Sequence, residues 1–509
     1  MSISSRTLTS AARCERPLRV GNAAIMAVAL SLASSGHLCA QNLIPNGTYV
    51  ITNQASGLVL DDTAASTANG ALIDQWSSTG GSNQHWILTN LGNNTVRLIN
   101  VGSELALEVS GWSTANGGKI DQWAYSGGNN QLWVVVSKGN SQFALLNKNS
   151  GLALDDPGWS KAAGTDMDQW SAGGGANQNW SFASSIAPAP VDSQATAATR
   201  SLYTYIRSNY QTNIISGQTD QDTFTTVYQL TGKYPLIRDY DMQPYSPEYS
   251  YSWSNTAINP NTGQPGWYTF GPDSSNPNTP DAISWYQSNN GKPIIDWQWH
   301  WHSPMGGIVG TNTFDASYTT FDVSRAVTPG TAEYTATLRD IDAIAVQLQK
   351  LNAAGVPIIW RPLHEAEGGG FWWDAKGPGP YIALWQLMYN RLVNYHGLHN
   401  LIWAWTGDDP VWYPGNNEVD ILGIDSYPGN YNYETNQLEY NKVLAICGGT
   451  KIIAMTENGP IPDINSALST GAPWAFFMSW YDVTIGNDNN HLISVFDNPN
   501  VITLENTTR

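Results

Sequence analysis

The stretch VPIIWRPLHE, Val356–Glu365, is an apolar run that ends in a carboxylate, and IIAMTE, Ile452–Glu457, has the same form. Continuous apolar runs are typical of strands in a parallel sheet that helices cover on both faces. From Ser201 onward we find eight such runs. They are Asn213–Gln218, Pro235–Asp241, Pro293–His300, Val356–Glu365, Leu401–Trp405, Ile421–Tyr427, Ile452–Glu457 and Trp474–Trp480. Eight strands joined by crossover helices predict an α/β TIM (β/α)8 barrel over residues 201–509.

Two carboxylates stand out in this arrangement. Glu365 and Glu457 would lie at the carboxyl ends of the fourth and seventh strands, which is where barrels of this kind carry their functional residues. Hydrolysis of a glycosidic bond needs one acid to protonate the leaving oxygen and one carboxylate to meet the positive charge that develops on the sugar. Two glutamates in different surroundings can fill both roles. The pair therefore predicts glycoside hydrolase chemistry.

The composition fits a protein that acts on carbohydrate. The 509 residues include 23 Trp and 24 Tyr, but only 13% are charged. Aromatic rings match the flat apolar faces of sugars, although a Trp-rich core is the alternative explanation. The formal net charge of −18 argues against nucleic acid as a partner, and the length predicts two or three domains.

The first 40 residues have the features of a secretory signal peptide. Four arginines precede an apolar run over residues 23–33, and the small residue Ala40 stands before Gln41. The apolar run is too short to span a bilayer. This pattern predicts that residues 1–40 are removed and that the protein is secreted, with no membrane association.

Residues 46–183 repeat with a period of 47 residues. The tetrapeptides IDQW, IDQW and MDQW end at Trp76, Trp123 and Trp170, and a second tryptophan follows ten residues later in NQHW, NQLW and NQNW. Short alternating runs between Gly, Asn and Ser turns indicate that each unit is all-β. Three copies of a unit that cannot bury its apolar face alone predict one closed domain over residues 41–183. We interpret the second tryptophan of each copy as a core residue.

These motifs resemble the ricin-B-like β-trefoil lectins, a family of carbohydrate-binding modules. The resemblance implies one sugar pocket in each repeat, with plant or microbial cell-wall glycans as ligands. An upstream acid, the Asp and Trp of the DQW triplet and a later Asn-Gln pair would form each pocket. The implied residues are Asp61, Asp74, Trp76, Asn83, Gln84, Glu108, Asp121, Trp123, Asn130, Gln131, Asp155, Asp168, Trp170, Asn177 and Gln178.

Two features qualify the trefoil prediction. Glu108 stands in the second repeat where the others have Asp, and its longer side chain would crowd that pocket. The alternative for all three repeats is that the polar residues only close turns. After the repeats, the segment SSIAPAPVDSQATAATR alternates Pro with small residues, which predicts a Pro/Ala-rich linker over residues 184–200.

Beyond Ser201 the chain resembles glycoside hydrolase family 26, whose members are mainly endo-β-1,4-mannanases. Five motifs carry the resemblance: DWQWHWHSP (Asp296–Pro304), WRPLHEAEGGGFWW (Trp360–Trp373), GIDSY (Gly423–Tyr427), TENG (Thr456–Gly459) and FFMSWYD (Phe476–Asp482). The resemblance implies Glu365 as acid/base, Glu457 as nucleophile and net retention of anomeric configuration. It implies neither a cofactor nor a metal ion.

Further residues follow from the same resemblance. The implied substrate contacts are His300, His364, Tyr427, Trp480 and Trp372. Tyr427 could also hold the carboxylate of the nucleophile through its hydroxyl, and Trp372 is expected either to pack or to line the cleft. One departure from the family is Gly370, where members usually have tryptophan. A missing ring would loosen a substrate subsite.

Several functions remain open at this level. We expect a monomer that cleaves mannan-type polysaccharide. The same mechanism could instead act on β-1,3-xylan or mixed-linkage β-glucan. The pair His300 and His302 is compatible with a metallohydrolase, although the strands that should supply further ligands end in Trp405 and Tyr427. An inactive barrel would leave a carbohydrate-binding protein without catalysis.

Overall fold

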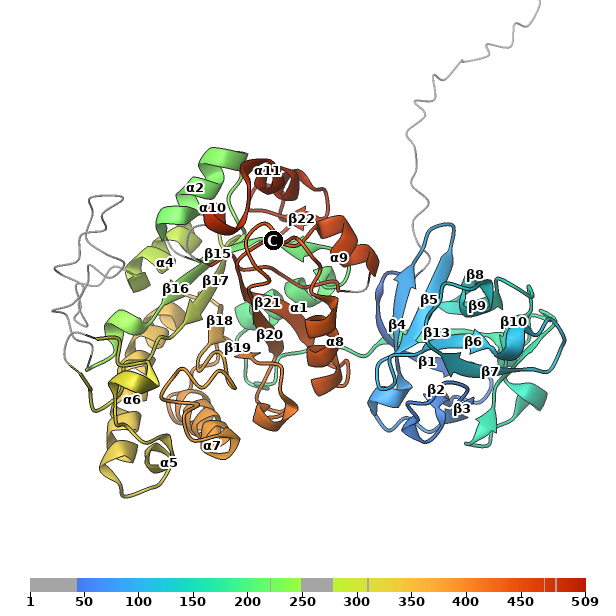
Figure 1. The fold of residues 1–509 in the computed structure, drawn as a ribbon, viewed down its shortest axis with the longest axis horizontal. Coiled ribbons are helices and arrows are strands. Elements are labelled where there is room, and N and C mark those ends of the chain that lie inside the picture. Colours follow the sequence, from blue (N-terminus) through green and yellow to red (C-terminus); the bar gives the residue numbers. More distant parts are fainter. Residues whose placement is uncertain (1–43, 220, 249–277, 309–310, 471, 481–482) are drawn as a thin grey trace, which may run out of the picture. The chain divides into compact units, whose positions relative to one another are not determined.

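The computed structural model describes residues 44–509 except 220, 249–277, 309–310, 471 and 481–482 (Figure 1). The predicted signal peptide lies outside the described residues. None of the helices in the described part of the chain combines the length and the apolar character that crossing a bilayer requires.

The first described region is all-β. Its strands pair antiparallel throughout, and short turns and 3-10 turns join them (Figure 1). The strands are β1 (Gly47–Asn53), β2 (Val59–Asp62), β3 (Ile73–Trp76), β4 (His85–Asn90), β5 (Thr95–Asn100), β6 (Ala106–Val109), β7 (Gly118–Trp123), β8 (Trp133–Gly139), β9 (Gln142–Asn147), β10 (Ala153–Asp155), β11 (Thr165–Asp166), β12 (Asp168–Trp170) and β13 (Trp180–Ser184).

Three buried tryptophans form the centre of the all-β core. Trp86, Trp133 and Trp180 are fully buried among Leu, Ile and Val side chains. Each indole N–H donates to the carbonyl oxygen of the residue 26 positions earlier, Leu60 at 3.0 Å, Leu107 at 3.0 Å and Leu154 at 3.2 Å. These hydrogen bonds satisfy the one polar atom that each ring buries. The prediction that the second tryptophan of each repeat is a core residue is confirmed.

The second region is built on a parallel sheet of seven strands. In sheet order these are β15 (Gly217–Thr219), β16 (Ile237–Asp241), β17 (Ile294–Gln298), β18 (Ile358–Arg361), β19 (Leu401–Thr406), β20 (Ile421–Ser426) and β21 (Ile452–Asn458). A separate parallel pair joins β14 (Ile214–Ile215) to β22 (Val501–Ile502). Nearly every residue of these strands is buried, as the continuous apolar runs predict.

Helices connect and flank the strands of this sheet (Figure 1). They are α1 (Ala197–Asn209), α2 (Gln221–Thr231), α4 (Asn278–Ser288), α5 (Val323–Ala326), α6 (Ala332–Ala353), α7 (Pro378–Tyr389), α8 (Gln437–Ile446), α9 (Ile464–Thr470), α10 (Val483–Gly486) and α11 (Asn489–Asp497), and α7 continues into a π-helical turn, Asn390–Tyr395. Helix α6 ends just before Gly355, whose φ of 72° allows the left-handed turn that stops it.

Residues 474–480, predicted as the eighth strand, form no regular strand. Isolated bridges join Phe476 to Ile215, and Ser479 to both Gln218 and Asn458. This segment therefore hydrogen bonds to strands at both edges of the seven-stranded sheet. Its ladder is irregular because the amide N–H of Met478 donates to the side-chain oxygen of Asn458, at 2.8 Å, in place of a backbone carbonyl.

The fourth strand is shorter than predicted. Strand β18 ends at Arg361, and Glu365 lies in the loop beyond it. Pro362 has no N–H with which to continue the ladder. Leu363 and Glu365 then adopt left-handed φ values of 51° and 54°. Glu365 is therefore a loop residue rather than the last residue of a strand.

The predicted linker is also shorter than expected. Helix α1 begins at Ala197, and Thr196 caps it by accepting a hydrogen bond from the amide of Thr199. Before the cap, the amide of Val191 donates to Asp420 Oδ1 at 2.7 Å. The end of the linker segment, residues 197–200, is therefore the first turn of a helix.

The buried tryptophans should dominate the stability of the all-β region. We predict that Trp133→Ala lowers its free energy of unfolding by about 3–5 kcal/mol, because it removes a fully buried ring and orphans the carbonyl of Leu107. The matched control is Trp123→Ala, whose ring is 46% exposed. Urea unfolding followed by circular dichroism would measure both variants. Equal losses would contradict the assignment of Trp133 to the core.

Candidate active site

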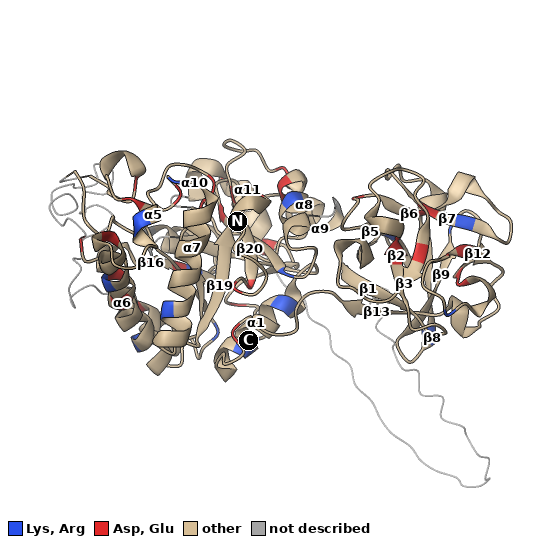
Figure 2. Ribbon diagram, turned by 90° about the horizontal axis from the view of Figure 1, so that it is seen from below, with Lys and Arg blue, Asp and Glu red and all other residues tan. Residues whose placement is uncertain are grey.

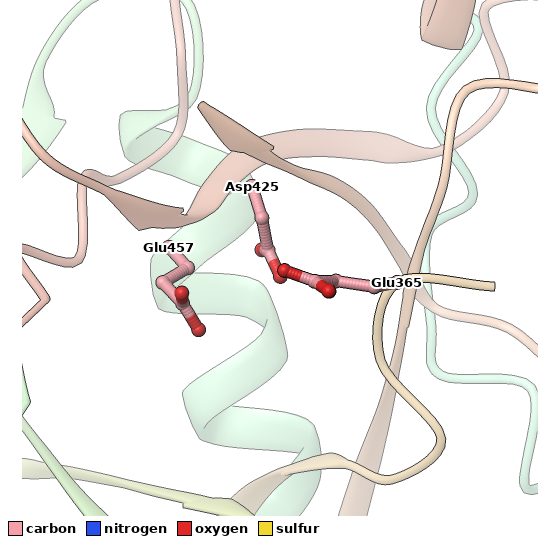
Figure 3. Close-up of side chains that lie close together, drawn as sticks. All are labelled: Glu365, Asp425 and Glu457. Atoms are coloured by element: carbon pink, nitrogen blue, oxygen red, sulfur yellow. The ribbon is translucent and has the colours of Figure 1, made fainter. Parts of the chain in front are cut away.

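Three carboxylates meet beyond the ends of the parallel strands. Glu365 comes from the loop after β18, Asp425 from β20 and Glu457 from β21 (Figure 3). One oxygen of each carboxylate lies within 4.8 Å of the others. The structure thus brings together the two glutamates that the sequence singled out, and it adds a third acid. Asp425 was missed although it stands in the GIDSY motif near the end of a predicted strand.

A buried arginine joins two of these acids. Arg361 is 1% exposed, and its Nη1 donates to Asp425 Oδ2 at 3.1 Å while its Nη2 donates to Glu457 Oε2 at 2.8 Å. Nη2 also donates to Gln298 Oε1 at 2.7 Å, which fixes the plane of the guanidinium. Arg361 thus pairs with two carboxylates at once. This cation stabilises negative charge on the side of the site where Glu457 lies.

Both oxygens of Glu457 have donors. The hydroxyl of Tyr427 donates to Glu457 Oε1, which is the contact predicted from the sequence, and Arg361 serves Oε2. Burial and the neighbouring charge of Glu457 raise the pKa of Tyr427 above its usual value, so its proton stays on the phenol as a donor. Two donors aimed at one carboxylate fix its orientation.

Glu365 has different surroundings. Burial raises the pKa of Glu365, and repulsion from Glu457 adds to that effect, while Arg361 opposes it. Burial likewise raises the pKa of Asp425 well above its usual value, although Arg361 beside it favours the ionised form. The two glutamates therefore have different surroundings, since Glu457 has Arg361 and Tyr427 as donors whereas burial raises the pKa of Glu365.

Two histidines and a tryptophan lie beside the carboxylates. The ring centroids of His300 and His364 are 4.6 Å apart, and those of His300 and Trp480 are 5.8 Å apart. Asp241 holds His300 through a 2.6 Å contact between its Oδ2 and Nδ1 of the ring. Burial lowers the pKa of His364 well below its usual value, so its imidazole is neutral. The structure thus groups three of the predicted substrate contacts.

The prediction for Trp372 as a substrate contact is wrong. Its ring is fully buried, packs against Trp301 and Phe321, and donates its N–H to the carbonyl oxygen of Trp301 at 2.6 Å. A ring without exposed surface cannot stack on a sugar. By contrast, a Cβ added at Gly370 would meet no atom within 4 Å. The position where the family usually has tryptophan is open space.

The two histidines of the WHWH run do not converge on a common ligand. His302 is buried, and its Nδ1 lies 2.9 Å from Thr313 Oγ1, whereas His300 pairs with Asp241. Among the described residues, the group of acids, histidines and cysteines with converging ligand atoms consists of Glu365, Asp425 and Glu457. The donor set expected for a His-x-His zinc site is therefore not assembled by the described part of the chain.

The all-β region contains three acidic clusters of similar design, one at each of the predicted sugar pockets. Acidic residues lie on strands β2, β3, β6, β7, β10 and β12 (Figure 2). The upstream acid of each repeat faces the DQW aspartate across the sheet, in the pairs Asp61–Asp74, Glu108–Asp121 and Asp155–Asp168. The DQW tryptophans Trp76, Trp123 and Trp170 are 44%, 46% and 48% exposed. The predicted acids and rings are thus adjacent in all three repeats.

The glutamines of these pockets, predicted to bind sugar, are instead structural residues. Gln178 accepts from the amide of Gly173 at 2.8 Å and donates to Ser171 O at 3.1 Å and to Asp155 Oδ1 at 2.7 Å. Its amide group is thus engaged inside the protein. Gln84 and Gln131 likewise each accept from one backbone amide and donate to one backbone carbonyl and to the upstream acid of their repeat. Turn closure, the alternative weighed from the sequence, describes these residues.

The asparagines differ between repeats. Asn83 donates to Asp61 Oδ1 at 2.9 Å, and Asn177 donates to Asp155 Oδ1 at 2.8 Å. In the second repeat Asn130 donates to the carbonyl oxygen of Val109 at 3.4 Å, as Asn83 does to that of Asp62 at 3.3 Å and Asn177 to that of Asp156 at 3.2 Å. That the longer Glu108 crowds the second pocket stays a prediction.

Comparisons with known proteins agree with both regions. The family model described as glycosyl hydrolase family 26 matches residues 191–506, and the model described as ricin-type beta-trefoil lectin domain-like matches residues 40–123 and 129–223. A mannan endo-1,4-beta-mannosidase of Thermothelomyces thermophilus is 40% identical over 304 residues, which are 58% of this chain and 57% of that protein. Mannan endo-1,4-beta-mannosidase B of Piromyces sp is 34% identical over 320 residues, 60% of this chain and 51% of that protein. The chain spans about half the length of the curated relatives it matches.

Two solved mannanase structures are similar to this chain. A beta-mannanase from a symbiotic protist of the termite Reticulitermes speratus, complexed with gluco-manno-oligosaccharide, aligns with 63% of this chain and 98% of its own, at 32% identity and a TM-score of 0.54. The Podospora anserina GH26-CBM35 beta-(1,4)-mannanase aligns with 90% of this chain and 98% of its own, at 26% identity and a TM-score of 0.56.

Removal of the buried guanidinium of Arg361 should lower the stability of the protein in a way that depends on pH. We predict that Arg361→Ala lowers the free energy of unfolding by about 3–5 kcal/mol at pH 7, because Asp425 and Glu457 lose their partner while buried. Burial already raises the folded-state pKa of Asp425, and loss of the cation raises it further. An acid with a raised folded-state pKa destabilises the fold above that pKa and not below its unfolded-state pKa. The deficit should therefore shrink between pH 7 and pH 4.

Chemical denaturation at the two pH values measures this deficit. Arg325→Ala is the control, because Arg325 forms an exposed pair with Glu333 and should change stability little at either pH. A deficit of equal size at pH 7 and pH 4 would show that packing, rather than charge, explains the loss.

Proposed function

Because the chain belongs to glycosyl hydrolase family 26 over residues 191–506, we propose that it is a secreted, retaining endo-β-1,4-mannanase that acts as a monomer. We include in this proposal an eight-stranded (β/α)8 barrel, in which residues 474–480 are the eighth strand. The bridges from that segment to both edges of the seven-stranded sheet support such a closure. The three 47-residue repeats are proposed to form a β-trefoil that binds polysaccharide, and residues 1–40 to be its signal peptide.

One observation carries the catalytic proposal. The carboxylate oxygens of Glu365 and Glu457 lie within 4.8 Å of each other. Retaining glycosidases hold their two carboxyl groups about 5 Å apart so that one can attack the sugar directly, whereas inverting enzymes leave about 6.5–9.5 Å for a water molecule. The short separation supports retention.

The two glutamates then share the work of a double displacement. Glu457, ionised and oriented by Arg361 and Tyr427, attacks the anomeric carbon, while Glu365 transfers its proton to the departing glycosidic oxygen. The first step leaves a glycosyl ester on Glu457 and a free chain end. In the second step Glu365, now ionised, takes a proton from water, whose oxygen attacks the anomeric carbon and releases Glu457.

The other residues position the sugar and the nucleophile. His300 and His364 present imidazole groups beside the reacting centre, and Trp480 presents a ring on which a pyranose could stack. Asp425 acts through Arg361, because it shares the guanidinium that orients Glu457. Mannan is the proposed substrate because the relatives named above are mannanases. The trefoil would raise the concentration of the barrel at a polymer surface.

Two substitutions test the roles of the glutamates. We predict that Glu365→Gln lowers kcat on mannan by about 10²–10⁴-fold but spares the first step on an aryl glycoside, whose leaving group needs no acid. Glu457→Ala should abolish turnover of both substrates. Reducing-sugar release from glucomannan and release of the aryl group measure these outcomes. Reducing-sugar release from β-1,3-xylan and lichenan shows whether the wild-type chain acts on those polymers instead. Glu434→Gln, an exposed carboxylate on the same domain, is the control. Equal, mild losses in both variants would contradict the assignment.

The electrostatic link between the glutamates can be tested separately. Burial is the main cause of the raised pKa of Glu365, and the charge of Glu457 adds to it. We predict that Glu457→Gln, which removes that charge, lowers the pKa of Glu365 but leaves it above the usual value of a glutamate. A carbon-13 NMR titration of the Glu365 carboxyl in both proteins measures the change. An unchanged or higher pKa in Glu457→Gln would show that the two groups do not interact.

A further inference from the structure

The three repeats of the trefoil differ at one turn. Ala65, Trp112 and Trp159 occupy equivalent positions at steps of 47 residues, each at the end of a 3-10 turn, Thr63–Ala65, Ser110–Trp112 and Pro157–Trp159. The backbone is the same in all three, with left-handed φ values of 50°, 56° and 58°. The second and third repeats therefore carry an indole where the first has a methyl group.

Protein stability does not account for these indoles. A left-handed φ is unfavourable for a bulky side chain, and a large apolar ring gains most when it is buried. Trp112 and Trp159 are nevertheless 54% and 55% exposed. Neither belongs to the buried core of the trefoil. Because Ala65 has the same φ with only a methyl group, the turn itself does not require an indole, and the exposure of both rings points to a role outside the protein.

Each indole lies at the edge of an acidic pocket. A Cβ built on Gly128 would lie 2.8 Å from Trp112 Cζ2 and 2.6 Å from Asn130 Oδ1, and one built on Gly175 would lie 2.7 Å from Trp159 Cζ2 and 2.6 Å from Asn177 Oδ1. Only glycine therefore leaves room at these positions for both the ring and the side chain of the pocket asparagine. In the first repeat the same point at Gly81 meets Asn83 and Thr79, and no ring.

The pockets also offer hydrogen-bond acceptors that the protein leaves unused. The equivalent oxygens Asp74 Oδ1, Asp121 Oδ1 and Asp168 Oδ1 are buried in all three repeats and receive no hydrogen bond from the described residues, and in the second repeat the same holds for Asn130 Oδ1. The three aspartates are 3%, 4% and 7% exposed, so it is the rings that distinguish the second and third pockets from the first. Buried acceptors without partners are unfavourable unless a ligand or water supplies the donor. Hydroxyl groups of a sugar are donors of this kind.

We propose that Trp112 and Trp159 are glycan-stacking residues that extend the second and third pockets, but not the first, into sites for a chain of pyranoses. The ligand is a neutral polysaccharide whose sugar faces stack on the rings while its hydroxyl groups donate to the pocket acids. The third pocket is the stronger of the two, because Asp155 is held there by both Asn177 and Gln178. This inference rests on the proposed carbohydrate binding of the trefoil and names the residues that decide which pockets bind.

The full chain carrying Glu457→Ala is a suitable parent for the test, because it should bind polymer without cutting it. Affinity electrophoresis in gels that contain galactomannan, glucomannan, xylan or mixed-linkage β-glucan reports binding as retardation. Trp112→Ala and Trp159→Ala should each weaken retardation by at least one of these polymers, the latter by about tenfold in affinity. The double variant Trp112→Ala/Trp159→Ala should lose the part of the retardation that comes from the trefoil. Any binding in the catalytic cleft is common to all of these proteins.

Two variants make the comparison sharper. Ala65→Trp should create the missing stacking surface in the first repeat and increase retardation. Leu91→Ala, which removes another exposed apolar side chain of the trefoil, should leave retardation unchanged. Turnover of a short manno-oligosaccharide by chains that retain Glu457 should be unaffected by any of these substitutions, and an unchanged circular dichroism spectrum and urea unfolding curve check that the trefoil of each variant is folded.

Three results would overturn the proposal. A double variant that migrates like its parent in every gel would exclude stacking on these rings, and so would a parent that no gel retards. An Ala65→Trp chain that migrates like its parent would show that an indole is not what the first repeat lacks. Failure of the wild-type chain to hydrolyse mannan would instead refute the proposed enzyme activity, and would leave the binding comparison intact.

Discussion

The buried guanidinium of Arg361 holds the catalytic region together. It donates to Asp425, to Glu457 and to Gln298, which come from three different strands of the parallel sheet. A cation with 1% exposure needs such partners, and the acids need the cation equally, because none of these charges could be buried alone. This mutual requirement fixes Glu457 in position and keeps negative charge on one side of the site.

The opposite side of the site is governed by the backbone. Pro362 ends strand β18 early, and the left-handed residues Leu363 and Glu365 turn the chain so that Glu365 approaches Glu457. Strained φ values at functional residues persist only where the surrounding structure enforces them. Here the indole of Trp373 donates to the carbonyl oxygen of His364 at 3.1 Å, between the two strained residues. The buried indole of Trp373 therefore supports the loop rather than lining a cleft.

The three repeats of the trefoil share one backbone structure but differ in some of the side chains that it carries. Its buried tryptophans and closed glutamine turns recur in every repeat, whereas the pocket acid and the turn residue vary. Packing demands tolerate little change in a core, but an exposed position at a pocket edge can vary without loss of the fold. Differences between the repeats are therefore expected to affect binding rather than stability.

The sequence alone determined the repeat period, the order of the strands along the chain and the core role of Trp86, Trp133 and Trp180, and it singled out Glu365 and Glu457, because a repeat and the end of an apolar run are local properties of a chain. Only the tertiary structure decided which groups meet. Asp425, Arg361 and Glu457 lie far apart in sequence, and their partnership depends on the adjacency of strands. The burial of Trp372 and the exposure of Trp112 and Trp159 could not be predicted from the sequence either. Whether a tryptophan packs in the core or faces solvent depends on which residues surround it in the folded chain.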